Sequence, residues 1–215
     1  MIILTDTAGR IKQQAHDLFM QYGFRSVSMD DIANKLGMSK KTIYQFYADK
    51  EELVTAIVNE TIQENECSSD ANSKAAENAV HEIFLAIDMV TEMLGEMNPS
   101  LLFDMQKYHP QAFAIFQKHK NEYLYKVMRE NIIRGIAEEL YRPDVNIELI
   151  SRFRVETMLL PFNPEFQQKV KLNMVAIHEE LLMQYLFGLA TPKGYKLITK
   201  YQLERNKKQP NDAKK

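Results

Sequence analysis

The sequence is short of the residues on which several common kinds of chemistry depend. Cys67 is the single cysteine among 215 residues, so no internal disulfide and no cysteine zinc cluster can form. The five histidines do not have the spacing of metal ligands, and the chain contains neither a glycine-rich phosphate loop nor a nucleophile elbow. We therefore expect no catalytic residue, no metal and no cofactor.

Long apolar runs are missing as well. No uninterrupted apolar stretch approaches the roughly eighteen residues that a bilayer crossing requires, and the N-terminus lacks a basic segment followed by an apolar one. The sequence therefore predicts a soluble, cytoplasmic protein with no membrane partner. Glycine and proline number only seven each, and most of them stand where helices would end, so the predicted fold class is all-α.

Charge is distributed unevenly. The net charge of -2 argues against a uniformly basic, nucleic-acid-binding surface. Residues 1–50, however, hold seven Lys+Arg against five Asp+Glu, so this part is positive while the rest of the chain is negative. If the protein binds nucleic acid, the N-terminal part is the expected binding region.

Two short helices joined by a tight turn are predicted between Ser28 and Lys50. Ser28 and Asp31 have the spacing of a capping box at the start of the first helix. Gly37 supplies the left-handed residue that ends this helix, and Ser39 can cap the second one. The pattern is that of a helix-turn-helix.

The outward face of the second helix combines cationic and hydrogen-bonding side chains, which can reach base edges in a DNA major groove. Neighbouring hydroxyl groups and Lys50 could contact phosphates. An ordinary solvated helix start is the alternative reading of the two adjacent lysines. The predicted DNA-contacting residues are Ser28, Ser39, Lys40, Lys41, Thr42, Tyr44, Gln45 and Lys50.

The run from Ile11 to Leu53 resembles the DNA-binding domain of the TetR family (TetR/AcrR-like) of transcriptional regulators. Phe46 stands where many members have a histidine that contacts a phosphate, so this contact is not carried over and a contact by Phe46 stays open. The residues that carry the resemblance are Gly37, Ser39, Ile43, Tyr44, Tyr47, Lys50, Glu51 and Leu53.

The resemblance implies a three-helix DNA-binding head followed by a helical body that dimerises and encloses a small-molecule pocket. The expected protein is a homodimeric repressor that binds a palindromic operator in double-stranded DNA and is released by a small apolar or amphipathic effector. The alternatives are a DNA-binding regulator without a small-molecule ligand, or a helical scaffold or enzyme. The expected domains are the head at 1–48, the body at 49–204 and a disordered polar tail at 205–215.

Several element boundaries follow from periodicity and from helix-breaking residues. We expect a short arm over residues 1–6 and a polar break at 68–73 after the helix that joins head and body. A long helix is expected from about 111 to 141, and another from about 144 to 159. A further long helix, from about 164 to 189, precedes a last one that ends near Gln202.

The body also offers candidate residues for the effector and for the dimer. Methionine and aromatic side chains can line an adaptable pocket, although core packing explains any one such residue more often. Tyr108 is a pocket candidate that could also sit on a surface turn with His109. The pocket candidates are Phe84, Met89, Phe103, Tyr108, Phe113, Phe116 and Met158, and the expected dimer-interface residues are Met174, Ile177, Leu181 and Tyr185.

Overall fold

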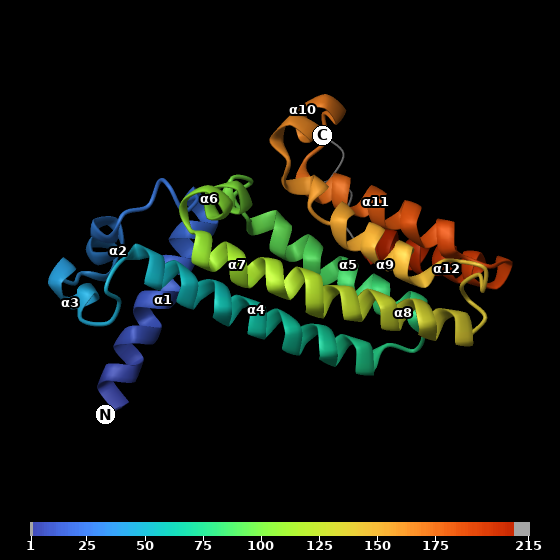
Figure 1. The fold of residues 1–215 in the computed structure, drawn as a ribbon, viewed down its shortest axis with the longest axis horizontal. Helices are drawn as coiled ribbons and strands as arrows, with labels where there is room; N and C mark the ends of the chain where they lie inside the picture. Colours follow the sequence, from blue (N-terminus) through green and yellow to red (C-terminus); the bar gives the residue numbers. More distant parts are fainter. Residues whose placement is uncertain (1, 209–215) are drawn as a thin grey trace. The chain divides into compact units, whose positions relative to one another are not determined.

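The computed structural model describes residues 2–208 and is all-α (Figure 1). Within this range, strand-like pairing is limited to an isolated bridge between Tyr141 and Ala190. No helix in the described range is both long enough and apolar enough to cross a membrane. The elements are α1 Ile2–Tyr22, α2 Met29–Leu36, α3 Lys40–Tyr44, α4 Lys50–Ala75, α5 Ala79–Glu96, α6 Leu101–Tyr108, α7 Pro110–His119, the π-helical turn η1 Lys120–Leu124, α8 Tyr125–Ala137, α9 Ile147–Thr157, the 3₁₀ turn η2 Leu160–Phe162, α10 Pro164–Val170, α11 Met174–Leu189 and α12 Pro192–Lys208.

The chain packs into two compact units. The first, called the head unit below, comprises Met1–Cys67 and Met93–Asn121, and the second, the body unit, comprises Ser68–Glu92 and Glu122–Lys215. This is a division by packing. The functional division expected after residue 48 stays a prediction.

The head unit has its own apolar core, built from α1, α2, α3 and the start of α4 together with residues of α6 and α7. Figure 1 shows these helices at the N-terminal end of the colour range and in green. Ile11, Ile32, Ile43 and Leu53 are fully buried in this core. Full burial of such a side chain stabilises a fold by about 1.5–3 kcal/mol, so these helices depend on one another for stability. Tyr22 is 51% exposed because α1 ends at this residue and the chain turns away.

The body unit buries a second apolar cluster. Ile83 and Ile87 on α5, Ile132 on α8, Leu186 on α11 and Ile198 on α12 are at its centre, each almost fully buried. Ile83 and Ile87 are four residues apart, so they lie on one face of α5. Val155 on α9 belongs to the same cluster, so one core holds α5, α8, α9, α11 and α12 together.

The predicted polar break at 68–73 is wrong, because α4 continues through it to Ala75. Serine, aspartate and asparagine are poor helix formers, but tertiary contacts override such weak preferences. Asp70 accepts a hydrogen bond from the Tyr123 hydroxyl at 2.7 Å. The backbone carbonyls of Ser73 and Ala76 accept from the Arg134 guanidinium. These contacts hold the last turn of α4 in the body unit.

The single helix predicted from about 164 to 189 is two helices in the structure. Lys171 ends α10 in the left-handed region, at φ 57°. Asn173 then caps α11, its side chain accepting from the Ala176 N–H at 2.9 Å. Asn173 is a signal that sequence reading could have used, since asparagine is among the best N-cap residues.

The remaining differences lie at helix ends. Helix α1 begins at Ile2, so the arm predicted for 1–6 is helical from its second residue. Helix α12 extends to Lys208, so the part of the predicted tail at 205–208 is helical, and its remainder lies outside the described residues. The helix predicted to end at 141 ends at Ala137 after the π-helical turn, and the next one starts at Ile147 rather than 144.

Candidate nucleic-acid interface

Helix α2 begins with the predicted capping box. The Ser28 hydroxyl accepts from the Asp31 N–H at 3.2 Å, and the Asp31 carboxylate accepts from the Ser28 N–H at 2.8 Å. The hydroxyl of Ser28 also donates to this carboxylate at 2.6 Å. The hydrogen bond from the Ser28 hydroxyl, followed by the one from the Ser28 N–H, lowers the pKa of Asp31. The start of α2 is therefore fixed by reciprocal bonds within four residues.

The turn between α2 and α3 is equally well determined. Gly37 has φ 65°, the left-handed conformation that residues with a side chain adopt only at a cost. Its N–H donates to the Asn34 carbonyl and the Met38 N–H to the Ala33 carbonyl, which is the hydrogen-bond pattern of a Schellman motif. Ser39 then caps α3 by accepting from the Thr42 N–H at 3.1 Å. The structure thus forms the helix-turn-helix in the predicted place.

The outward face of α3 is exposed and cationic. Lys40 pairs with Asp30 at 2.9 Å and lies 6.0 Å from the ring centroid of Tyr44. Lys41 and Gln45 are exposed, and within the described part of the chain neither side chain forms a hydrogen bond or ion pair. Side chains in this state are available to base edges and phosphates of an approaching duplex.

Lys50 differs from the other predicted contacts because its ammonium points into the protein. It donates to the backbone carbonyls of Phe24 and of Val27, the latter at 2.5 Å. Burial lowers the pKa of Lys50, while the charges of Asp104 and Asp31 act in the opposite direction. The structure gives Lys50 a role in holding the loop between α1 and α2, so a phosphate contact by this residue stays a prediction that the geometry favours least.

The two aromatic residues after α3 are part of the head unit's interior. Tyr47 is buried, and its hydroxyl donates to the Ala8 carbonyl at 3.3 Å. Burial, followed by the charges of Glu60 and Glu52, raises the pKa of Tyr47 to about 12. Phe46 is partly buried and packs against the same core.

One supporting contact was not predicted from the sequence. His109, left open as a cavity or surface residue, is buried and bonds through Nδ1 to the Glu51 carboxylate at 2.6 Å. The other oxygen of Glu51 accepts from the Gln111 N–H at 3.1 Å. The partners are more than fifty positions apart, so no local pattern in the sequence indicates them. The contact ties α7 to the start of α4, within the head unit.

The candidate pocket residues do not all gather within one unit. The head unit holds Phe103 and Tyr108, which are exposed, and Phe113 and Phe116, whose ring centroids are 6.3 Å apart. The remaining three belong to the body unit. They are Phe84, Met89 and Met158.

The expected dimer-interface residues are mostly interior. Met174, Ile177 and Tyr185 are buried within the body unit, and only Leu181 is partly exposed. The assignment of these side chains to a dimer interface stays a prediction, and the burial of three of them within a single chain does not favour it. Helix α11 is apolar at most of its positions, so its periodicity does not separate the inward face from the outward one.

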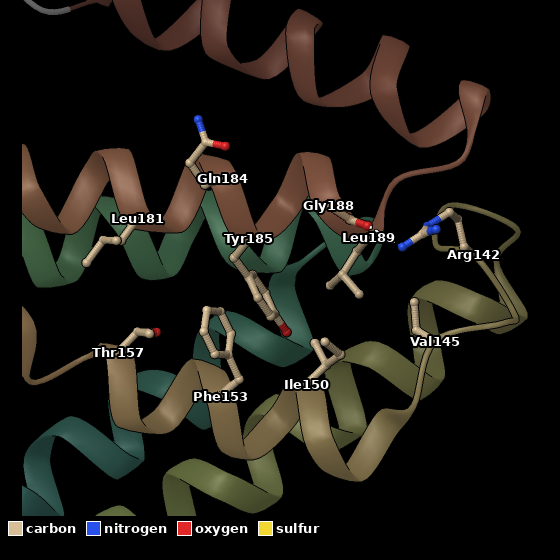
Figure 2. A pocket seen from close by; sticks show the side chains of 10 residues that line it. All are labelled: Arg142, Val145, Ile150, Phe153, Thr157, Leu181, Gln184, Tyr185, Gly188 and Leu189. Atoms are coloured by element: carbon tan, nitrogen blue, oxygen red, sulfur yellow. Dashed lines mark hydrogen bonds between the residues drawn. The ribbon is translucent and has the colours of Figure 1, made fainter.

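A groove of about 260 Å³ lies between α9 and α11. Figure 2 shows the ring of Tyr185 reaching from α11 toward α9, beside Phe153 and Ile150, with Arg142 at one end. The lining is mainly apolar. Sequence reading missed this groove because its walls come from helices separated by α10.

The helix-turn-helix at the N-terminus of an all-α chain defines a class, the DNA-binding transcriptional regulators with a helical body. Residues 11–57 match the family model described as "Bacterial regulatory proteins, tetR family". This segment of the chain is therefore similar to the N-terminal domain of the TetR family of transcriptional regulators.

Relatives of known sequence and structure agree with this assignment. The HTH-type transcriptional regulator YvaF of Bacillus subtilis (strain 168) is 25% identical over 161 residues, which are 74% of this chain and 83% of that protein. The HTH-type transcriptional repressor KstR2 of Mycobacterium tuberculosis is 23% identical over 69% of this chain and 76% of that protein.

Two solved structures share the fold. That of a TetR-family regulator from Agrobacterium tumefaciens has a TM-score of 0.72 at 17% identity, covering 87% of this chain and 99% of that one. That of KstR2, described as a ketosteroid transcriptional regulator, has a TM-score of 0.57 at 18% identity, covering 86% and 95%. The relatives found by sequence are regulators and not enzymes.

Proposed function

We propose that this protein is a homodimeric repressor that reads a palindromic operator through α3 and is released by a small apolar or amphipathic effector. The observation that carries the proposal is the exposed face of α3, where Lys41, Tyr44 and Gln45 stand on a helix whose start and preceding turn are fixed by hydrogen bonds. A helix in this setting can enter a major groove without further ordering. The proposal places the protein in the cytoplasm, together with its operator.

Dimerisation follows from the small size of the reading helix. Helix α3 has five residues and contacts few base pairs, each good contact contributing about 1–3 kcal/mol of discrimination. One head would therefore select poorly among the sites of a genome. Two heads related by a two-fold axis would read two half-sites, with their centres about one or more helical turns apart.

The face formed by α9 and α11 supports a dimer interface in place of the interior residues expected from the sequence. Leu149 is 63% exposed and Phe153 is 56% exposed, next to the apolar groove that Phe153, Leu181 and Tyr185 line. Exposed apolar patches of this kind mark interaction surfaces. Phe153 both projects from the face and borders a hollow, and such a patch can pair with its own copy across a two-fold axis.

Repression and release by a ligand are supported by the relatives. KstR2 is named a repressor and a ketosteroid transcriptional regulator, and ketosteroids are apolar molecules. A ligand can release a regulator from DNA if it binds one arrangement of the two heads better than the other. The effector of this chain is therefore proposed to be small and at least partly apolar.

Selection of bound DNA from a random pool, followed by sequencing, tests the reading function. We expect an enriched palindrome, bound less tightly as salt rises because phosphate contacts release counterions. Lys41→Ala should relax specificity at one position of each half-site, whereas Lys126→Ala, which removes an exposed lysine of α8, should have no effect. A pool without an enriched motif, or equal specificity in both variants, would refute the proposed docking face.

Sedimentation of the whole chain tests the dimer. Phe153→Glu places a charge on the α9–α11 face and should shift the protein toward the monomer. Phe103→Glu is the matched control, since Phe103 is 51% exposed and lies on α6. A wild-type protein that sediments as a monomer at micromolar concentration would contradict the proposal.

A further inference from the structure

The body unit buries three polar side chains that each have an unpartnered atom. Arg154 on α9 is 2% exposed, and His178 and Tyr185 on α11 are 5% and 6% exposed. Arg154 Nε, His178 Nε2 and the Tyr185 hydroxyl have no hydrogen-bond partner. Buried polar atoms in native proteins are usually hydrogen-bonded, so three such atoms in one region require an explanation.

Arg154 links these three side chains, called the Arg154 cluster below, because its charge acts on both Tyr185 and His178. The guanidinium carbon of Arg154 lies 5.8 Å from the ring centroid of Tyr185. Burial lowers the pKa of His178 to about 3, and the charges of Arg154 and Arg205 contribute to this in that order. The imidazole is therefore neutral at pH 7. Arg154, by contrast, keeps its charge, although burial lowers its pKa to about 10.

Arg205, another arginine of the body unit, forms ion pairs with carboxylates. Its guanidinium pairs with Asp88 and with Glu179, each at 2.6 Å. Within residues 2–208, by contrast, no carboxylate forms an ion pair with Arg154. Buried arginines are normally paired, because an uncompensated charge is costly in a medium of low polarity. The anion that would balance Arg154 is thus absent from the described part of the chain.

The chemistry of the missing partner follows from what the cluster offers. A guanidinium is a donor only, a tyrosine hydroxyl can donate, and a neutral imidazole donates from whichever nitrogen carries its proton. Two acceptor oxygens in one plane match the fork of an arginine, which makes a carboxylate the best fit. The apolar core that contains Tyr185 also contains Val155, Leu182 and Leu186, so the rest of the ligand meets hydrocarbon.

We propose that Arg154, with Tyr185 and His178, receives the carboxylate of an amphiphilic ligand inside the body unit. The inference deepens the proposed function by naming the chemical class of the effector and rests on that function for its regulatory meaning. Tyr185 also lines the α9–α11 groove, so a ligand bonded to its hydroxyl acts on a buried side chain that lies beside Phe153 of the proposed dimer face (Figure 2).

Calorimetric titration of the full chain at pH 7 tests the preference for a carboxylate. The probes are octanoate, decanoate and dodecanoate, each compared with the primary alcohol of the same length. At least one carboxylate should bind about tenfold or more tightly than its alcohol, since only the carboxylate can pair with an arginine. Equal affinities within every pair, or no carboxylate binding at about 1 mM, would overturn the proposal.

Two arginine variants locate the site. Arg154→Met should abolish the preference for the carboxylate and leave the affinity for the alcohol within about twofold, because methionine retains most of the apolar volume. Arg142→Met is the matched control: Arg142 is an exposed arginine that lines the groove. If Arg142→Met loses the preference and Arg154→Met keeps it, the carboxylate binds at the groove and the proposal is wrong.

Urea unfolding separates a ligand-binding role from a structural one. A buried cation whose partner is a ligand lowers the stability of the ligand-free protein. Arg154→Met should therefore unfold at the same urea concentration as wild type or at a higher one. Arg205→Met breaks two ion pairs and should unfold at a lower concentration. A loss in Arg154→Met as large as that in Arg205→Met would overturn the proposal. If a bound carboxylate fails to release DNA, the proposed effector control fails while the binding site stands.

Discussion

The helix-turn-helix and the Arg154 cluster use polar groups in opposite ways. In the helix-turn-helix, Ser28, Asp31 and Ser39 accept hydrogen bonds from backbone N–H groups of nearby residues, and the lysines of α3 are exposed. In the cluster, a cation and two further polar groups are buried with unpartnered atoms. The first arrangement stabilises the free protein, whereas the second costs stability and therefore indicates a function.

Hydrogen-bonded and unpartnered polar groups also differ in how far apart their neighbours lie in the sequence. The capping bonds of Ser28, Asp31 and Ser39 join residues three apart, so each can form as soon as its helix forms. The cluster joins α9 to α11 and exists only after the body unit has packed. Substitutions should therefore lower stability at satisfied sites and leave it unchanged, or raise it, at unsatisfied ones.

The largest effect is expected at Lys50, a half-buried cation of the head unit whose ammonium has hydrogen-bond partners. Lys50→Met removes its hydrogen bonds to the carbonyls of Phe24 and Val27. Bonds to a charged group contribute about 1.5–3 kcal/mol each, so the loss of two is expected to lower the free energy of unfolding by about 3–6 kcal/mol. Urea unfolding measures it, with Lys41→Met as an exposed control. Equal stability of the two variants would show that the partners of Lys50 contribute nothing.

The second effect is a pH dependence of stability that comes from His178. Its folded pKa of about 3 is below the unfolded value of 6.5, so the unfolded chain binds the extra proton between these two values. The contribution of the neutral His178 to the free energy of unfolding is therefore fully present above pH 6.5 and is lost as the pH falls toward 3. Between pH 7 and 5 this group should cost about 2 kcal/mol, and His178→Gln should show a decline smaller by that amount. Parallel declines in urea-unfolding free energy would contradict the burial of a neutral imidazole.

A smaller loss is expected at the cap of α3. Ser39→Ala removes the acceptor for the Thr42 N–H and should lower the free energy of unfolding by about 1 kcal/mol. Ser39→Asp can still cap the helix and serves as the control. If both variants are equally destabilised, the cap is not the reason for serine at this position.

The smallest effect is expected at Tyr185. Its hydroxyl is buried without a partner, so Tyr185→Phe removes a desolvated group and no hydrogen bond. Stability should stay unchanged or rise by up to about 1 kcal/mol. Thermal unfolding in the absence of ligand measures this, and a marked loss would mean that the hydroxyl has a partner in solution, so the contrast between the two sites would disappear.

The sequence predicted the helix-turn-helix well because the signals for its helix ends are local. The capping box at Ser28, the glycine at 37 and the cap at Ser39 each depend on residues within one turn. Sequence prediction failed where tertiary contacts decide. The polar stretch 68–73 is helical because partners from other helices hold it, and the inward residues of α11 were taken for an outward face because the helix is apolar almost all round.

The Arg154 cluster could not be predicted in the same way. Nothing near Arg154 in the sequence marks it as buried, since arginine is usually exposed. Its neighbours on α11 come into range only through the fold, and the absence of a carboxylate partner is a property of packing. Family resemblance implied a small apolar or amphipathic effector, but none of the pocket candidates named from the sequence belongs to the Arg154 cluster.

Cys67 lies exposed on α4 and is the single thiol of the sequence. A maleimide probe will therefore attach at one position without any prior mutation. In a two-fold dimer the probes form a single symmetric pair, and its spectroscopic distance distribution can be recorded for free protein, for protein on DNA and with each carboxylate. The chain thus carries its own reporter for the motion by which an effector would act.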